Sequence, residues 1–253
     1  PRLAALDLIH EGKFDQAKVA LETALAAESS NAPIQFLYGR IAHEEGRLDE
    51  AIEWYKKAAA NDPSMIKALF FQGEIHEAKR QFDQASARYT EVLRSNPSHN
   101  TARLGLVRVR IATGDLPGAE QLANQALAEA SAQQDREDQF LAHKVLALLH
   151  KQMNQNEKRL GHLKAAVGFK PTDTESVVEL VDHYLYEKDD VQAEAALLNA
   201  ANNGCAGPTF YERLVRFFID KDVAQAETYA NFGMESHPDS ALVYILRGEV
   251  AEK

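Results

Sequence analysis

The sequence has a single cysteine, few strand-forming residues and no long apolar run. That cysteine, Cys205, cannot form an intrachain disulfide, which excludes a disulfide-stabilised scaffold. No apolar stretch approaches the ~20 residues that a membrane-spanning helix needs, and no signal peptide is recognisable. β-Branched residues are sparse beside the abundant Ala, Leu, Glu and Gln, so we expect an all-helical fold.

Basic charge is also in deficit. The 253 residues include 28 Lys and Arg against 38 Asp and Glu, which gives a formal charge of −10. A surface of this sign repels phosphate backbones, so broad nucleic-acid binding is disfavoured, although a local basic patch can still exist.

What the sequence does contain is an internal repeat. A residue early in each presumed second helix, small in all units but one, recurs at steps of 34, 34, 34, 40, 34 and 33 residues. These positions are Ala17, Ala51, Ala85, Ala119, Arg159, Ala193 and Ala226. Most units also end at a matching position, occupied by Pro63, Pro97, Pro171, Cys205 and Pro238. The shared register predicts a series of helix–turn–helix units.

The unit from Gly39 to Pro63 shows how each pair is expected to pack. Gly39, Ala51 and Ala58 are small where two helices must approach, and Tyr55 fills the space that they leave. The turns, such as residues 46–49 and 188–190, pair a glycine or lysine with aspartate. We expect the glycines to end the first helices in the left-handed conformation and the aspartates to cap the second helices.

This pattern resembles the tetratricopeptide repeat family, whose motif is W-x2-L-G-x2-Y followed by A-x3-F, A and P. The resemblance covers nearly the whole chain. It implies an all-α, right-handed superhelical solenoid of antiparallel helix pairs, with about seven and a half units. We expect one array over residues 1–253, with units at 1–31, 32–65, 66–99, 100–139, 140–173, 174–206 and 207–240 and a capping or truncated helix at 241–253.

The pattern departs from a regular array in three places. Six extra residues follow the fourth unit, so we expect its second helix to run on by a turn or more and residues 133–138 to form a polar loop. Arg159 stands at a small-residue position, with Gly161 nearby, which suggests a local adjustment of helix crossing. The chain begins with Pro1 and partway through a unit. We therefore expect a fragment or processed product, and the compartment stays open, with the cytoplasm slightly favoured over the periplasm.

No catalytic or metal-binding pattern stands out. The recurring His-Glu pairs at 10, 43 and 76 lack the second histidine of the H-E-x-x-H motif, and their recurrence follows from the repeat. His143 and His150 share a helix face, but two nitrogens make a poor zinc site, so both are interpreted as packing or groove residues. Cys205 is expected to be a buried filler. We expect no enzyme activity, no metal and no cofactor.

The resemblance implies that the first helices line a concave groove that binds a partner. The expected groove residues are those outside the packing pattern, and the leading candidates are Phe36, Arg40, His43, Phe70, Glu74, Arg108, Lys144, Leu148, Lys151, Asp182 and Tyr211. The same rule adds Glu77, Leu104, Ile111, Val178, Leu185, Val215 and Phe218. Aromatic and Arg anchors are typical of peptide interfaces.

The ligand is expected to be a protein or peptide, with an acidic segment as one option because Arg40, Arg108, Lys144 and Lys151 form a basic stripe. Some members of the family bind a C-terminal carboxylate through a Lys–Asn clamp. The position of the first Asn holds none here, so we do not expect that specificity; its occupants are Leu6, Arg40, Glu74, Arg108, Leu148, Asp182 and Val215.

The leading hypothesis is a non-catalytic scaffold or adaptor in the assembly or regulation of a multiprotein complex. The alternative is a regulatory or targeting region of a larger enzyme, signalling protein or secretion- or pilus-type protein. Self-association through terminal helices is also open. RNA binding by related helical repeats is disfavoured by the charge of −10.

Overall fold

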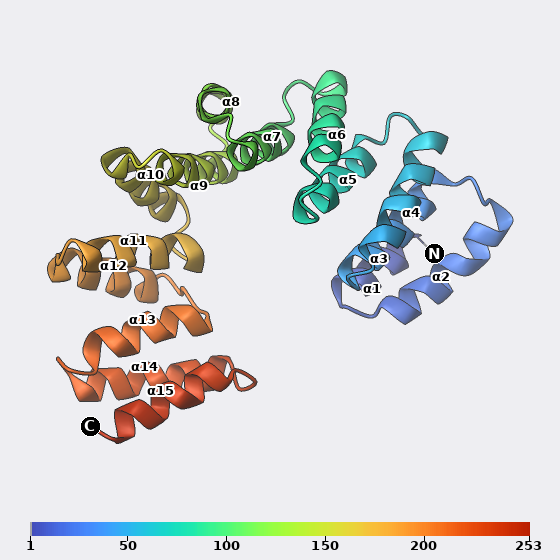
Figure 1. Cartoon of the computed structure of the whole chain (residues 1–253). Coiled ribbons are helices and arrows are strands. Elements are labelled where there is room, and N and C mark those ends of the chain that lie inside the picture. Colours follow the sequence, from blue (N-terminus) through green and yellow to red (C-terminus); the bar gives the residue numbers. More distant parts are fainter. Residues whose placement is uncertain (1) are drawn as a thin grey trace. The chain divides into compact units, whose positions relative to one another are not determined.

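The computed structural model describes residues 2–253 and, within them, the side chains of all residues except Arg2 and Thr23. The described residues form fifteen α-helices and no strand, as the composition predicted (Figure 1). In chain order the helices are α1 (Arg2–His10), α2 (Phe14–Ala27), α3 (Ala32–Glu44), α4 (Leu48–Asn61), α5 (Ile66–Ala78), α6 (Phe82–Ser95), α7 (Asn100–Thr113), α8 (Leu116–Gln133), α9 (Arg136–Gln152), α10 (Asn156–Phe169), α11 (Thr174–Tyr186), α12 (Asp190–Asn202), α13 (Pro208–Phe218), α14 (Val223–Ser236) and α15 (Ala241–Ala251).

The helices belong to two compact units, residues 1–129 (the N-unit) and residues 130–253 (the C-unit), whose boundary falls inside α8. Within each unit, successive helices pack as pairs, such as α3 with α4 and α13 with α14. Each first helix also contacts a following first helix, as α5 contacts α7 and α11 contacts α13. These are the contacts of stacked helix pairs, in which each pair buries its apolar face against its neighbours.

The predicted packing register is confirmed. The alanines at the six small positions are completely buried, namely Ala17, Ala51, Ala85, Ala119, Ala193 and Ala226. A Cβ atom on Gly39 would lie 2.5 Å from Cε1 of Tyr55, so the tyrosine ring occupies the space that the glycine leaves. Tyr55 itself is 0% exposed. Small and large residues therefore interlock across each helix crossing, as close packing requires.

The inter-helix turns agree with the prediction for the glycines. Gly12, Gly46 and Gly114 adopt φ values of 72°, 76° and 87°, and each follows a first helix. In later turns the same conformation falls to other residues, including Arg80 at 57° and Asn154 at 54°. A left-handed residue satisfies the last carbonyls of a helix, and the surrounding turn sustains it even where the residue is not glycine.

The prediction that aspartate caps the second helices is right for some pairs and wrong for others. Asp189 caps α12, because its Oδ1 accepts a hydrogen bond from the backbone N–H of Gln192 at 3.1 Å. In contrast, α4 begins after Arg47, which makes no side-chain cap, and Asp49 lies inside the first turn. There its carboxylate interacts with the positive end of the helix dipole instead of capping it.

The insertion after the fourth unit lengthens helices and leaves a short connection. Helix α8 runs to Gln133, which confirms the predicted extension, but the predicted polar loop over residues 133–138 is wrong. Only Gln134 and Asp135 lie between the helices, because Asp135 caps α9 by accepting from the N–H of Asp138 at 2.9 Å. Arg159, at a small-residue position, is 16% exposed in its side chain and reaches Glu179 on α11 at 3.0 Å.

The end of the C-unit is covered by α15. This helix buries Val243, Leu246 and Val250 and exposes Tyr244 and Ile245, so one apolar face packs and the other meets solvent. Cys205 is 4% exposed and lies at the boundary of two pairs, which confirms its interpretation as a buried filler.

Candidate functional site: the faces of the first helices

An aromatic row crosses the N-unit from one helix pair to the next. The ring of Phe36 on α3 lies 5.5 Å from Tyr55 on α4 and 5.8 Å from Phe71 on α5, and Tyr55 stacks on Phe71 at 5.6 Å. Tyr55 is buried, whereas Phe36 and Phe71 are half-buried. Such ring pairs contribute about 0.5–1.5 kcal/mol each beyond their buried area. The row thus holds its rings firmly while leaving part of two of them accessible.

The aromatic row continues through Phe70, whose ring lies 5.6 Å from Phe71 and stacks on His99 at 5.2 Å. Phe36 and Phe70 were expected on this face, and both are half-buried. Phe71 was missed, because the repeat register places it one residue beyond the position that Phe36 occupies in its own helix. Its neighbour Phe70 drew the prediction, and only the packing shows that both rings join the row.

Arg40 and His43 border the aromatic row. The Arg40 guanidinium lies 5.1 Å above the ring of Phe71, and its Nη2 donates to Glu44 at 3.0 Å. His43 meets Phe71 edge-on at 6.0 Å, and burial lowers the pKa of its imidazole. At neutral pH the edge of the row therefore carries one cation and one neutral imidazole.

A charged group lies farther along the N-unit. Arg108 on α7 donates two hydrogen bonds to the Glu77 carboxylate on α5, at 2.6 and 2.9 Å, and Tyr89 donates to the same carboxylate at 2.7 Å. Burial alone would lower the pKa of Arg108, but the bonds to Glu77 outweigh burial and raise it. The guanidinium is thus committed to neighbouring helices, where a bidentate pair fixes their relative rotation.

Glu74 lies between these two cations on α5. Burial raises the pKa of its half-buried carboxyl, the positive charge of Arg108 opposes that shift, and the negative charge of Glu77 adds to it. Because Glu74 shares its helix with Phe70 and Phe71, it adds an acid to a surface that is otherwise aromatic and cationic.

In the C-unit, charged residues of one first helix pair with those of the next. Lys144 on α9 lies 3.2 Å from Asp173 and 2.7 Å from Glu175, and Lys151 lies 3.1 Å from Glu179. Asp182 on α11 accepts from Arg213 on α13 at 2.6 Å. Leu148, between the two lysines on α9, is 38% exposed, and the hydroxyl of Tyr211 lies 3.4 Å from that of Ser236.

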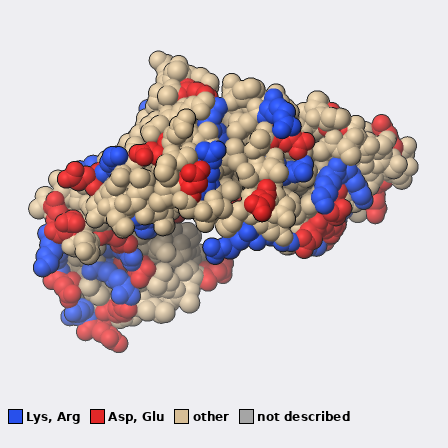
Figure 2. Space-filling model, turned by 45° about the horizontal axis from the view of Figure 1, so that its top comes forward, with Lys and Arg blue, Asp and Glu red and all other residues tan. Residues whose placement is uncertain are grey.

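These contacts change the interpretation of the expected basic stripe. Each of Arg40, Arg108, Lys144 and Lys151 has a carboxylate within 3.2 Å. Figure 2 accordingly shows basic and acidic side chains interspersed over the visible face instead of a field of one sign. The stripe is neutralised inside the chain, so it gives little attraction for an acidic ligand.

Three further groove predictions are wrong. Leu104, Val215 and Phe218 are 1%, 0% and 3% exposed, so they belong to the core and not to an outward face. The repeat pattern identifies positions that do not pack within a pair, but the contacts with neighbouring pairs then bury some of them.

Between α9 and α10, three histidines form a stack that the sequence indicated only in part. His143 and His162 approach Nδ1 to Nδ1 at 2.9 Å, and His150 stacks on His162 with ring centroids 5.2 Å apart. Burial, reinforced by His143 and His150, lowers the pKa of His162 to about 4. In the described part of the chain no group of three or more His, Cys, Asp and Glu residues is arranged to hold a metal ion.

The described helices also lack any segment with the length and apolar character needed to cross a bilayer. No curated protein sequence matches this chain. Among solved structures, a tetratricopeptide repeat protein from Parabacteroides merdae is similar over 98% of this chain and 96% of its own, with 17% identity and a TM-score of 0.64.

Two further structures share the fold. The Cut9–Hcn1 hetero-tetramer of the APC/C is similar over 98% of this chain and 48% of its own, with 15% identity and a TM-score of 0.65. The pilF protein of Pseudomonas aeruginosa is similar over 100% of this chain and 96% of its own, with 18% identity and a TM-score of 0.53. The family model "Tetratricopeptide repeat" matches residues 2–66 and 70–135 of the sequence. With the buried small-and-large register of its helix pairs, this match shows that the chain belongs to the tetratricopeptide repeat family.

Proposed function

We propose that the chain is a non-catalytic scaffold that binds a polypeptide segment along the first-helix face of the N-unit. The observation that carries the proposal is the aromatic row, whose half-buried Phe36 and Phe71 are bordered by Arg40 and His43. Aromatic and arginine side chains held in place by packing are the usual anchors of protein interfaces. Repeats of this family generally mediate interactions between proteins.

The role that fits best is the assembly or regulation of a multiprotein complex. A structure with the same fold, Cut9–Hcn1, is a hetero-tetramer, and this supports the proposal as an analogy at the level of fold. The ligand we propose is bound by apolar contact and not by acidity, because the cations on the first helices already have carboxylate partners.

Position-specific photo-crosslinking tests the proposal. A benzophenone amino acid at Arg40 or Phe70 should form adducts with one recurring polypeptide segment, identified by mass spectrometry. The matched control is the same probe at Thr90, an exposed residue on the second helix α6. Equal adducts at Thr90 and Arg40, or adducts with no recurring segment, would contradict the assignment of this face.

The alternative, a regulatory or targeting region within a larger enzyme or secretion-type protein, keeps one supporting observation. The similar region covers only 48% of the Cut9–Hcn1 chain, so arrays of this kind occur within longer polypeptides. The complete reading frame decides this: a catalytic, receiver or membrane segment on either side would favour the alternative, and immediate start and stop codons would exclude it.

Self-association through α15 remains a second proposal about partners. Tyr244 and Ile245 on this helix are 49% and 56% exposed, and a Cβ added at Gly248 would meet nothing within 4 Å. Light scattering over a range of concentrations tests it, and a monomer mass throughout would exclude it.

A further inference from the structure

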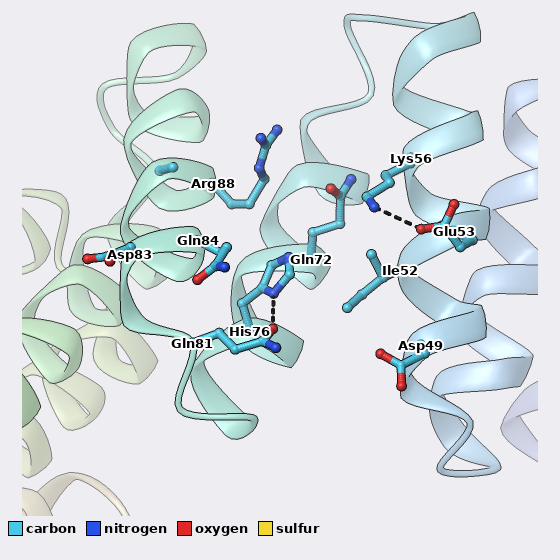
Figure 3. Close-up of a pocket in the computed structure, with 11 residues that line it drawn as sticks. Asp49, Ile52, Glu53, Lys56, Gln72, His76, Gln81, Asp83, Gln84 and Arg88 are labelled. Atoms are coloured by element: carbon cyan, nitrogen blue, oxygen red, sulfur yellow. Dashed lines mark hydrogen bonds and ion pairs between the residues drawn. The ribbon is translucent and has the colours of Figure 1, made fainter.

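The N-unit contains a polar cleft that the first-helix face does not include. It has a volume of about 860 Å³ and lies between the second helices α4 and α6, with α5 as its floor. Figure 3 shows Gln72 and His76 of α5 between Ile52 and Lys56 on one side and Gln84 and Arg88 on the other.

Gln72 is the unusual residue of this cleft. The residues at the same position of the later helix pairs are all leucines, and Leu106, Leu146, Leu180 and Leu214 are all buried. Gln72 is buried to the same degree, with 2% exposed, yet its Nε2 has no hydrogen-bond partner among the described residues. A buried amide without a partner is unfavourable for folding, so its presence where the repeat uses leucine calls for a ligand that accepts a hydrogen bond.

His76 supplies the complementary group. It follows Gln72 by four residues, so both side chains lie on the same face of α5. Its Nδ1 lies 2.7 Å from Oε1 of Gln81, and because an amide oxygen only accepts, Nδ1 carries the proton. In the neutral imidazole Nε2 is then an acceptor. The cleft floor therefore presents one donor and one acceptor, the complement of a peptide group.

The charges at the cleft favour a basic ligand. Its two cations have intramolecular partners, since Lys56 lies 2.8 Å from Glu53 and Arg88 lies 2.7 Å from Glu91. Asp83 is exposed at the start of α6 and makes no ion pair within 4.0 Å among the described residues. The chain as a whole carries a charge of −10, which steers basic segments toward it.

We propose that this cleft binds a short extended segment of a partner polypeptide. Gln72 and His76 bind one main-chain amide of the segment, and Asp83 pairs with an adjacent lysine or arginine. The site is separate from the aromatic row, so the scaffold has two docking faces on one unit and either face can fail its test without the other.

The test is a titration of the ¹⁵N-labelled chain with two capped pentapeptides of serine and alanine, one with a central lysine and one with a central glutamate. The side-chain amide signal of Gln72, assigned by its loss in Gln72→Leu, should shift saturably with the lysine peptide. Asp83→Asn should remove the preference for lysine, which an exposed ion pair limits to about threefold in Kd. Equal shifts with both peptides on the unmodified chain, or no saturation at Gln72, would overturn the proposal.

The matched control is Gln35, a second buried glutamine at 4% exposed whose amide is satisfied. Its Nε2 donates to the carbonyl of Ser29 at 2.6 Å and its Oε1 accepts from Asn61 at 2.9 Å. Gln72→Leu should keep or raise the unfolding midpoint and abolish peptide binding, whereas Gln35→Leu should lower the midpoint and keep binding. Unchanged binding by Gln72→Leu would also overturn the proposal. Asp83→Asn, at an exposed residue, provides the same test even if Gln72→Leu does not fold.

Discussion

The ring of Tyr89 is held between two helices, and this makes a sharp prediction about glycine. A Cβ at Gly73 would lie 2.7 Å from Cε1 of the ring, and a Cβ at Gly105 would lie 2.5 Å from Cζ. Since the ring is completely buried and bounded by a helix backbone on each side, it cannot move away from an added methyl group. Its hydroxyl is also bonded to Glu77 at 2.7 Å.

We therefore expect Gly105→Ala to destabilise the N-unit. Alanine gains about 1 kcal/mol of helix propensity over glycine, but overpacking a core costs about 1–3 kcal/mol. The matched control is Gly161→Ala on α10, where a Cβ would meet nothing within 4 Å. That variant receives the propensity gain alone and should be stabilised by about 1 kcal/mol.

Urea unfolding followed by far-ultraviolet circular dichroism measures both changes. A second background isolates the cause: in Tyr89→Leu the obstructing ring is absent, so adding Gly105→Ala should become stabilising, a non-additivity that a double-mutant cycle reports directly. If Gly105→Ala raises the midpoint of the unmodified chain as much as Gly161→Ala does, the close packing of Tyr89 is wrong.

Three further predictions follow from burial, capping and titration. Ala51→Leu, at a site that is 0% exposed, should lower the free energy of unfolding by about 1–3 kcal/mol in urea; an unchanged value would refute the packing register. Asp189→Ala removes a side-chain cap and should cost about 0.5–2 kcal/mol, whereas Asp49→Ala removes no cap and should cost less; equal melting temperatures would contradict this difference. The pKa of His162 is lowered to about 4 in the fold, while an unfolded histidine titrates near pH ~6.5, so this group's contribution to stability is lost as the pH falls from about 6.5 toward 4. His162→Phe should reduce the drop in urea midpoint between about pH 7 and pH 5, and His10→Gln, at an exposed site, should leave that drop unchanged.

The groove residues show how far sequence patterns reach. Phe36, Arg40, His43 and Phe70 were expected on the first-helix face, and the structure brings them to one aromatic row, although their role in binding stays a proposal. Phe71 was missed because the register of 34 does not set how two neighbouring pairs rotate against each other. That rotation decides which of two adjacent rings reaches the next helix.

Charge was the least predictable feature of the surface. Counting residues gave a net acidity and a basic stripe, but the pairings of that stripe are distant in sequence. Arg108 binds Glu77, and Lys144 binds Glu175, each 31 residues away. Only stacked pairs bring such residues within hydrogen-bond distance, so the neutralisation of Arg108 and Lys144 could not be derived from the chain alone.

The sequence by itself determined the helix pairs and their internal packing, because a small residue at Ala51 and a ring at Tyr55 meet through spacing along one helix, which 3.6 residues per turn dictates. Tertiary structure alone decided which surfaces remain for partners. The position of Tyr89 between two glycines, the histidine stack on α9 and α10 and the unpaired amide of Gln72 all depend on how one pair seats on the next. That seating results from side-chain contacts across helices, which a repeat spacing constrains but does not specify.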